Sequence, residues 1–200
     1  MNWIIALLVA ASLWGGWHWW TSERHVRVPN GIVAPVEPKQ TNFDVARSFP
    51  AKEHTFYVRA RYEITARVLR KEIYRIDGGA NLAPVDLGLG WGVMSDSEIV
   101  DQLEFSQMGR FLFWKPRDWR KFPITLRELN IYAAQVHAIP ADDKIESQLR
   151  KLRPGHVVTL TGYLVDVRGP GGFAWNTSLR RDDTGDGACE IMWIEQVSVD

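Results

Sequence analysis

Residues 56–68 alternate between apolar and polar side chains without a break, and this pattern constrains the fold more than any other feature of the chain. The apolar side chains take every second position, at Phe56, Val58, Ala60, Tyr62, Ile64, Ala66 and Val68. Successive side chains of a β-strand point to opposite faces, so the segment is predicted to be a long strand with one face on a core. The other face carries Arg59, Arg61 and Arg67 and is predicted to be solvated, with an anion-binding face as the alternative.

Further apolar runs and capping signals extend this sheet into a domain. The apolar runs predict strands over 105–114, 157–167, 173–179 and 188–199. Capping residues at the required spacing predict short helices over 96–104, after Thr125 with Glu128, and after Asp142 or Asp143. Long strands joined by short helices and glycine-rich corners predict an α+β domain that is mainly β, built as a curved sheet or a small OB-like barrel.

The first twenty residues have a different character. Residues 3–20 contain no Asp, Glu, Lys or Arg, and four tryptophans gather at the far end of the segment. An apolar helix of about 27 Å with aromatic side chains at one end suits a bilayer whose core is about 30 Å thick. We therefore predict a transmembrane anchor over 1–22 that contacts the lipid bilayer through residues 3–20. A cleaved signal peptide is the alternative, although no Lys or Arg precedes the apolar run.

The anchor sets the expected organisation and location of the rest. Residues 23–53 contain four prolines and are predicted to be a tether, and residues 54–200 are predicted to form the globular β-rich domain. We expect a single-pass protein of the bacterial inner membrane with a periplasmic domain. The positive charges that follow the helix would instead favour a cytoplasmic domain, so topology stays open at this point.

Charge and cysteine content limit the classes of partner. The chain has 24 Lys and Arg residues against 24 Asp and Glu residues, and a neutral chain argues against a general nucleic-acid binder. An OB-type nucleic-acid binder, kept as a third interpretation, would need exposed aromatic side chains on a basic groove. Cys189 is the one cysteine, so an internal disulfide is impossible.

Two segments, one glycine-rich and one polar, have compositions that are typical of ligand-binding loops. Residues 88–92, Gly-Leu-Gly-Trp-Gly, lack the ending of a phosphate loop and are predicted to allow close packing around Trp91, with ligand binding as the alternative. Within residues 180–187, Asp182, Thr184, Asp186 and Gly187 match the first half of a calcium-loop spacing, but the twelfth position counted from Asp182 is Trp193 where a Glu is required. We expect a turn held by its own Asp side chains. The alternative is loose cation binding by Asp182, Asp183, Asp186 and Glu190.

Candidate catalytic groups are few. Cys189 with His137 has the residue types of a nucleophile and its base, and Ser178 with His137 and Asp182 has those of a triad. No nucleophile elbow surrounds Ser178, and a cysteine that begins an apolar strand is typically a small buried hydrophobe. The histidines lack zinc-ligand spacing, so we expect no metal and no cofactor.

Several segments together resemble a group of uncharacterised bacterial membrane-anchored proteins. These segments are Gly31–Pro35 with Glu37, Pro38 and Gln40; Pro84–Gly92 with Met94–Asp96; His137–Ala141; and Ser178–Arg180, Asp183–Gly185 and Gly187–Glu190. The resemblance implies a shared fold and an envelope setting, and it carries over no activity or catalytic residue.

The leading hypothesis is a membrane-tethered, non-catalytic binding or scaffold domain of the bacterial cell envelope with a protein partner. Its expected surface combines the 84–96 loop, residues 137–140 and the 178–190 loop. The expected binding residues are Asp86, Trp91, His137, Arg180, Asp183 and Glu190. The alternative is a membrane-anchored hydrolase that uses His137 with Ser178 or Cys189.

Overall fold

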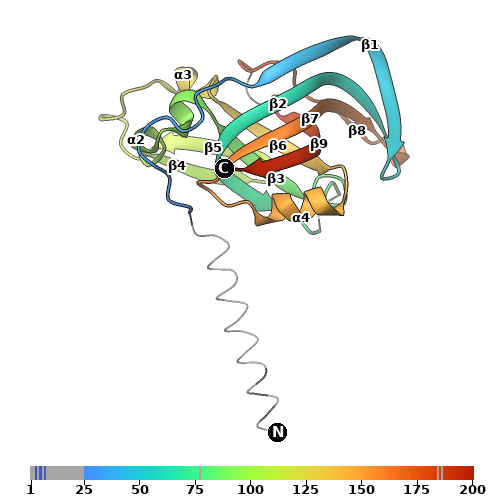
Figure 1. Cartoon of the computed structure of the whole chain (residues 1–200), viewed down its shortest axis with the longest axis horizontal. Helices are drawn as coiled ribbons and strands as arrows, with labels where there is room; N and C mark the ends of the chain where they lie inside the picture. Colours follow the sequence, from blue (N-terminus) through green and yellow to red (C-terminus); the bar gives the residue numbers. More distant parts are fainter. Residues whose placement is uncertain are drawn as a thin grey trace.

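The computed structural model describes Trp3, Ile5, Leu7 and residues 25–76, 78–183, 185 and 187–200. It is mainly β, with short helices at the edges of a curved sheet (Figure 1). The strands are β1 (Lys39–Ala51), β2 (His54–Ile73), β3 (Val85–Gly90), β4 (Leu103–Met108), β5 (Phe111–Pro116), β6 (Ala133–Pro140), β7 (Val157–Arg168), β8 (Ala174–Trp175) and β9 (Glu190–Val199). The α-helices are α2 (Ser97–Val100), α3 (Leu126–Asn130) and α4 (Asp143–Lys151), and the 3₁₀ helices are η1 (Gly92–Ser95) and η2 (Pro170–Gly172).

The main sheet curves until its pairings form a ring. From β2 the pairings run to β3, β6, β9 and β7, and β7 pairs again with β2. The β6–β9 pair is parallel, whereas the other pairs of the ring are antiparallel. Strand β2 closes the ring because its first part, residues 55–67, pairs with β7 and its last part, residues 67–73, pairs with β3.

The inner face of this ring is the core. The alternation over 56–68 is confirmed as part of β2, and its apolar side chains are buried. Those that meet the main core are joined by side chains of β3, β6, β7 and β9, among them Leu87, Val136, Leu160 and Met192. Helix α4 adds Ile145 and Leu149 to the same core, and the Asp142 side chain caps its first turn as predicted.

Two glycines allow backbones to approach where a side chain would not fit. A Cβ on Gly162 of β7 would lie 1.9 Å from the carbonyl oxygen of Trp193 on β9, beside an irregularity in the strand register. A Cβ on Gly155 would lie 2.2 Å from the carbonyl oxygen of Val26, and Gly155 also has a φ of +97°. The second contact places Val26 directly against the turn that follows α4.

Some predicted elements differ from the observed ones. The strand expected over 105–114 is a hairpin of β4 and β5, because Gly109 takes a φ of +56° and turns the chain. The helix expected over 96–104 is only one turn, α2, since β4 begins at Leu103. The strand expected over 173–179 is reduced to β8. The capping box of Thr125 with Glu128 at the start of α3 is confirmed.

Much of the predicted tether belongs to the domain. Residues 39–51 form β1, which pairs with β2 at the edge of the sheet, where a strand tolerates a proline such as Pro50. Earlier residues also pack on the domain: Ala34 is 1% exposed and its amide donates to Ser95 Oγ at 3.1 Å. The prolines therefore mark turns and an edge strand and not a free linker from 23 to 53.

The predicted anchor, residues 1–22, lies outside the described residues except for Trp3, Ile5 and Leu7, which are helical and exposed. Within the part of the chain that the structure describes, no helix has the length and apolar character needed to cross a membrane.

Candidate binding groove

The fold brings together the three segments that the sequence singled out. Asp86 on β3 stands opposite His137 on β6, and Val136 stands opposite Glu190 on β9. The amide of Ser178 donates to the carbonyl oxygen of Cys189 at 3.0 Å, which fixes the intervening loop beside the start of β9. Most of 84–96 is not the expected surface loop, however, because it forms β3 and η1 and is largely buried.

Two of the predicted binding residues, Asp86 and His137, are buried and hydrogen-bond to each other. Asp86 Oδ1 lies 2.9 Å from His137 Nδ1 and 3.0 Å from Arg110 Nη1, and Asp86 is 1% exposed. The His137 ring packs against Trp175 with 4.6 Å between ring centroids. Trp91 is 1% exposed within the main core, as its predicted packing role requires. These three residues pack within the curved sheet and do not line the groove described next.

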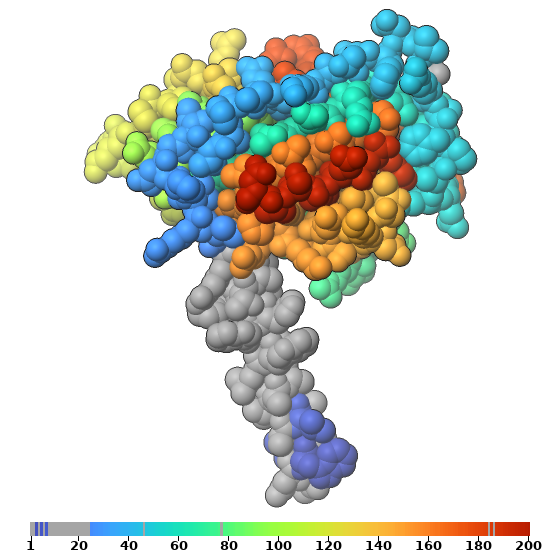
Figure 2. Space-filling view, viewed as in Figure 1, coloured from blue at the N-terminus to red at the C-terminus, as the bar shows by residue number. Residues whose placement is uncertain are grey.

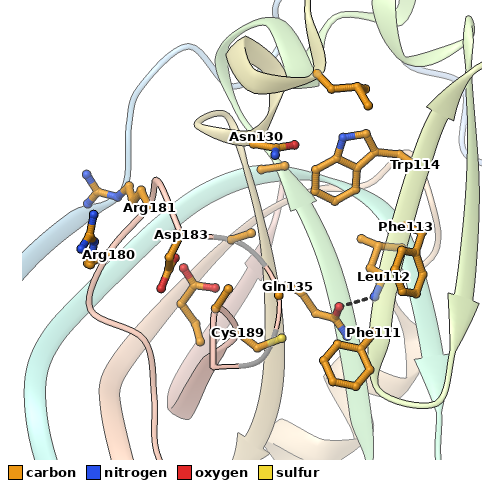
Figure 3. Close-up of a pocket in the computed structure, with 16 residues that line it drawn as sticks. Phe111, Leu112, Phe113, Trp114, Asn130, Gln135, Arg180, Arg181, Asp183 and Cys189 are labelled. Carbon is orange, nitrogen blue, oxygen red and sulfur yellow. Dashed lines mark hydrogen bonds between the residues drawn. The ribbon is translucent and has the colours of Figure 1, made fainter.

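A cavity of about 280 Å³ lies between β5, the start of β6 and the 178–190 loop (Figure 3). Its walls are mainly apolar and aromatic. One side is formed by Phe111, Leu112, Phe113 and Trp114, the floor by Ala133, Ala134 and Gln135, and the other side by Arg180, Arg181, Asp183, Cys189 and Glu190. We call this cavity the groove. Four of the residues named from the sequence, Arg180, Asp183, Cys189 and Glu190, therefore share one site.

Gln135 holds the aromatic side of the groove in place. Its Oε1 accepts from the Leu112 amide (Figure 3), and its Nε2 donates to the Arg110 carbonyl oxygen. Leu112 packs on Gly88 so closely that a Cβ there would lie 2.3 Å from the Leu112 side chain. The β4–β5 hairpin is thereby fixed over β3 and β6. The sequence analysis does not predict the aromatic side of the groove. The run of aromatic side chains from Phe111 to Trp114 indicates it, but there it predicts only a strand.

On the loop side of the groove, residues 178–183 hydrogen-bond to one another, as expected of a turn held by its own Asp side chains. Ser178 Oγ donates to Asp183 Oδ2 at 2.6 Å and accepts from the Arg180 amide at 3.0 Å. Arg180 forms a two-pronged bond to Asp182, with both contacts at 3.0 Å. Figure 3 shows the guanidinium groups of Arg180 and Arg181 directed away from the aromatic side. The polar end of the groove therefore presents the carboxyl groups of Asp183 and Glu190.

Glu190 is the unusual group of the site. It is 5% exposed, and its Oε2 has no hydrogen-bond partner among the described residues. Burial raises the pKa of Glu190 to about 8, and the nearby charge of Asp183 acts in the same direction. The carboxyl group is therefore protonated at neutral pH. It offers an uncharged donor and acceptor at the end of an apolar cavity.

The proposed catalytic residues fall into different hydrogen-bonded pairs. His137 Nδ1 contacts Asp86, whereas Ser178 Oγ contacts Asp183 and Asp182 contacts Arg180. The hydrolase alternative with His137 and Ser178 or Cys189 stays a prediction. Among the described His, Cys, Asp and Glu side chains, no three are grouped as metal ligands, and Asp186 lies outside the described residues.

Comparisons of the chain with protein-family models, with curated proteins and with solved structures found no match.

Proposed function

We propose that this protein is a membrane-tethered, non-catalytic binding domain of the bacterial cell envelope, and that the groove holds part of a protein partner. The observation that carries the proposal is the groove itself, an apolar cavity that ends on the buried Glu190 carboxyl with one oxygen unbonded among the described residues. A buried polar atom without a partner is costly, and a ligand donor or acceptor would relieve that cost.

The order of strands supports an OB-like barrel. Counted from β2, the ring is β2, β3, β6, β7 and β9 in chain order, with the third and fifth strands parallel and α4 between the third and fourth. OB-folds bind their ligands on the face of the second and third strands and with the loop between the fourth and fifth. By analogy, the groove occupies that position, because it uses β6 and the 178–190 loop.

The lining of the groove favours a particular ligand class. Phe111 and Phe113 are 40% and 47% exposed, and exposed aromatic side chains beside a cavity are typical anchors of protein interfaces. The end that holds the Asp183 and Glu190 carboxyl groups suits an apolar group that carries a hydrogen-bond donor, such as a side chain or amide of a peptide segment. A nucleic-acid backbone is disfavoured, because the Asp183 carboxylate lines the site and the two arginines point away.

The groove is tested by capture of partners from detergent extracts with the full chain and matched variants. Phe113→Glu places a charge on the aromatic side, and Met108→Glu places the same charge on the same hairpin outside the groove, where Met108 is 72% exposed. We expect Phe113→Glu to reduce capture of the specific partner about tenfold or more, as loss of an interface anchor does. Met108→Glu should capture it as the wild type does. Equal capture by both variants would refute the groove as the binding site.

The tether is tested separately by fractionation of cells that carry the full chain with a C-terminal reporter. We expect the protein in the membrane fraction and the reporter active outside the cytoplasm. A mature chain that begins after Trp20 and fractionates as soluble would refute the tether, and reporter activity only in the cytoplasm would refute the envelope placement.

A further inference from the structure

A second cavity, of about 440 Å³, lies where the 25–38 segment meets the end of β2. It is lined by basic side chains from several parts of the chain, namely His25, Arg67, Arg70, Lys71 and Arg117, and by one carboxylate, Asp101. We call it the basic pocket. Four Lys and Arg side chains face a single Asp in this lining, so the pocket carries an excess of positive charge.

Arg67 is the central group of the basic pocket. The sequence placed it on a solvated strand face, but it is only 5% exposed because η1 and α2 cover it. Its Nη1 donates to Ser95 O at 3.3 Å and to Ser97 Oγ at 3.0 Å, and both acceptors are uncharged. Its Nε has no hydrogen-bond partner among the described residues, and no described carboxylate forms an ion pair with it.

A buried guanidinium without a counter-ion is unfavourable. Burial lowers the pKa of Arg67, and the charges of Asp101 and Asp96 only partly oppose this effect. Arg70 beside it pairs with Glu72 at 3.4 Å through Nη2, while its own buried Nε also has no partner among the described residues. Both arginines line the basic pocket, and the planar guanidinium group is the side-chain group that best matches the oxygens of a phosphate.

The position of the basic pocket indicates where such an anion comes from. His25 lines it, and the Val26 amide donates to Pro154 O at 2.8 Å, so the chain enters the domain at the rim of the pocket. Figure 2 shows this first part of the domain, in blue, beside the orange turn that follows α4. Four residues lie between Trp20 and His25, and the five backbone steps span at most about 17 Å. If residues 3–20 lie in the bilayer, the pocket lies within reach of the lipid headgroups.

We propose that the basic pocket binds the phosphate of an anionic lipid headgroup and thereby orients the domain on the membrane surface. This proposal rests on the membrane tether of the proposed function. The chemistry it requires is a phosphate group, which a soluble phosphate would share. The lipid is the expected source because the rim of the pocket is the point where the chain leaves for the predicted anchor.

The test measures binding of short-chain phosphatidylglycerol and of inorganic phosphate to the full chain in uncharged detergent micelles, by the shift in thermal unfolding temperature. Arg67→Met and Arg70→Gln remove a donor from the pocket. Arg61→Gln is the matched control, because Arg61 lies on the same strand outside the pocket and pairs with Glu195 at the surface. We expect the lipid to raise the unfolding temperature of the wild type and of Arg61→Gln, with about tenfold weaker binding in either pocket variant.

Two outcomes would overturn the inference. An equal shift with inorganic phosphate at the same concentration would show a soluble phosphate site and refute the lipid source. A lipid effect that persists in Arg70→Gln, whose side chain is partly exposed and whose replacement should leave the fold intact, would refute the pocket. The measurement does not require residues 3–20 to be in a bilayer. A protein that fractionates as soluble yet binds the lipid would therefore refute only the tether.

Discussion

Replacement of Glu190 by Gln should make the protein more stable, and increasingly so as pH rises. The Glu190 carboxyl is buried at the end of the groove, and burial raises its pKa from 4.5 to about 8. Between these two values the folded state holds a proton that the unfolded state has lost. Stability therefore falls as pH increases across this window and levels off above pH 8.

The size of the effect follows from the same two values. One pKa unit corresponds to about 1.4 kcal/mol, so the ionisable Glu190 costs the wild type at most about 5 kcal/mol above pH 8. Gln has nearly the same shape and is uncharged at every pH. Glu190→Gln should match the wild type below pH 4.5, where Glu190 is protonated in both states, and should exceed it progressively above that pH.

The assay is urea unfolding of the full chain in uncharged detergent micelles, followed by tryptophan fluorescence at several pH values from 4.5 to 8.5. The quantity of interest is the difference in free energy of unfolding between variant and wild type, since other titrating groups cancel in it. Glu195→Gln is the matched control on the same strand. It removes a surface pair with Arg61 that is worth about 0–1 kcal/mol, so its difference should stay within that range at every pH tested.

Two results would refute this reasoning. A Glu190→Gln variant that is less stable than the wild type at pH 8 would mean that the ionised carboxylate is stabilised in the folded protein. A difference that does not change between pH 5 and 8 would mean that Glu190 titrates alike in the folded and unfolded states. Either result would also remove the uncharged carboxyl from the description of the groove.

Two further substitutions test the contact between β7 and β9 and the cap of helix α4. Gly162→Ala should lower the free energy of unfolding by about 2 kcal/mol or more in the same urea assay, because the new Cβ would collide with the carbonyl oxygen of Trp193; an unchanged midpoint would contradict this close approach. Asp142→Ala should cost about 1 kcal/mol, since the Asp142 side chain accepts from the Ile145 amide at 2.8 Å, whereas Asp143→Ala should cost less; an equal loss in both would contradict the assignment of the cap.

The two proposed sites share the β4–β5 hairpin. Leu103 and Phe105 of β4 line the basic pocket, whereas Phe111–Trp114 of β5 line the groove. The sheet register agrees, because Gly90 of β3 pairs with Arg67 of β2 on one side and with Ala133 of β6 on the other. Both sites therefore lie at the same end of β3.

The sequence by itself determined the elements whose signals are local. The alternation over 56–68 specified a long strand with a buried face, because neighbouring side chains of a strand point in opposite directions. Asp142 and Thr125 specified the starts of α4 and α3, because a cap depends on residues only three positions away. The turn around residues 180–183 was predictable for the same reason.

Only the tertiary structure decided which elements meet and what they cover. Nothing local indicates that β1 joins the sheet, that β2 pairs with both β3 and β7, or that the β4–β5 hairpin folds over β6 to form the groove. The chemistry follows the same division. Arg67 has the spacing of a solvated side chain yet is buried under η1 and α2, and Glu190 is an ordinary acid in sequence yet burial in the folded protein raises its pKa to about 8. Burial is set by contacts between residues that are distant in the chain, and neither periodicity nor capping spacing carries that information.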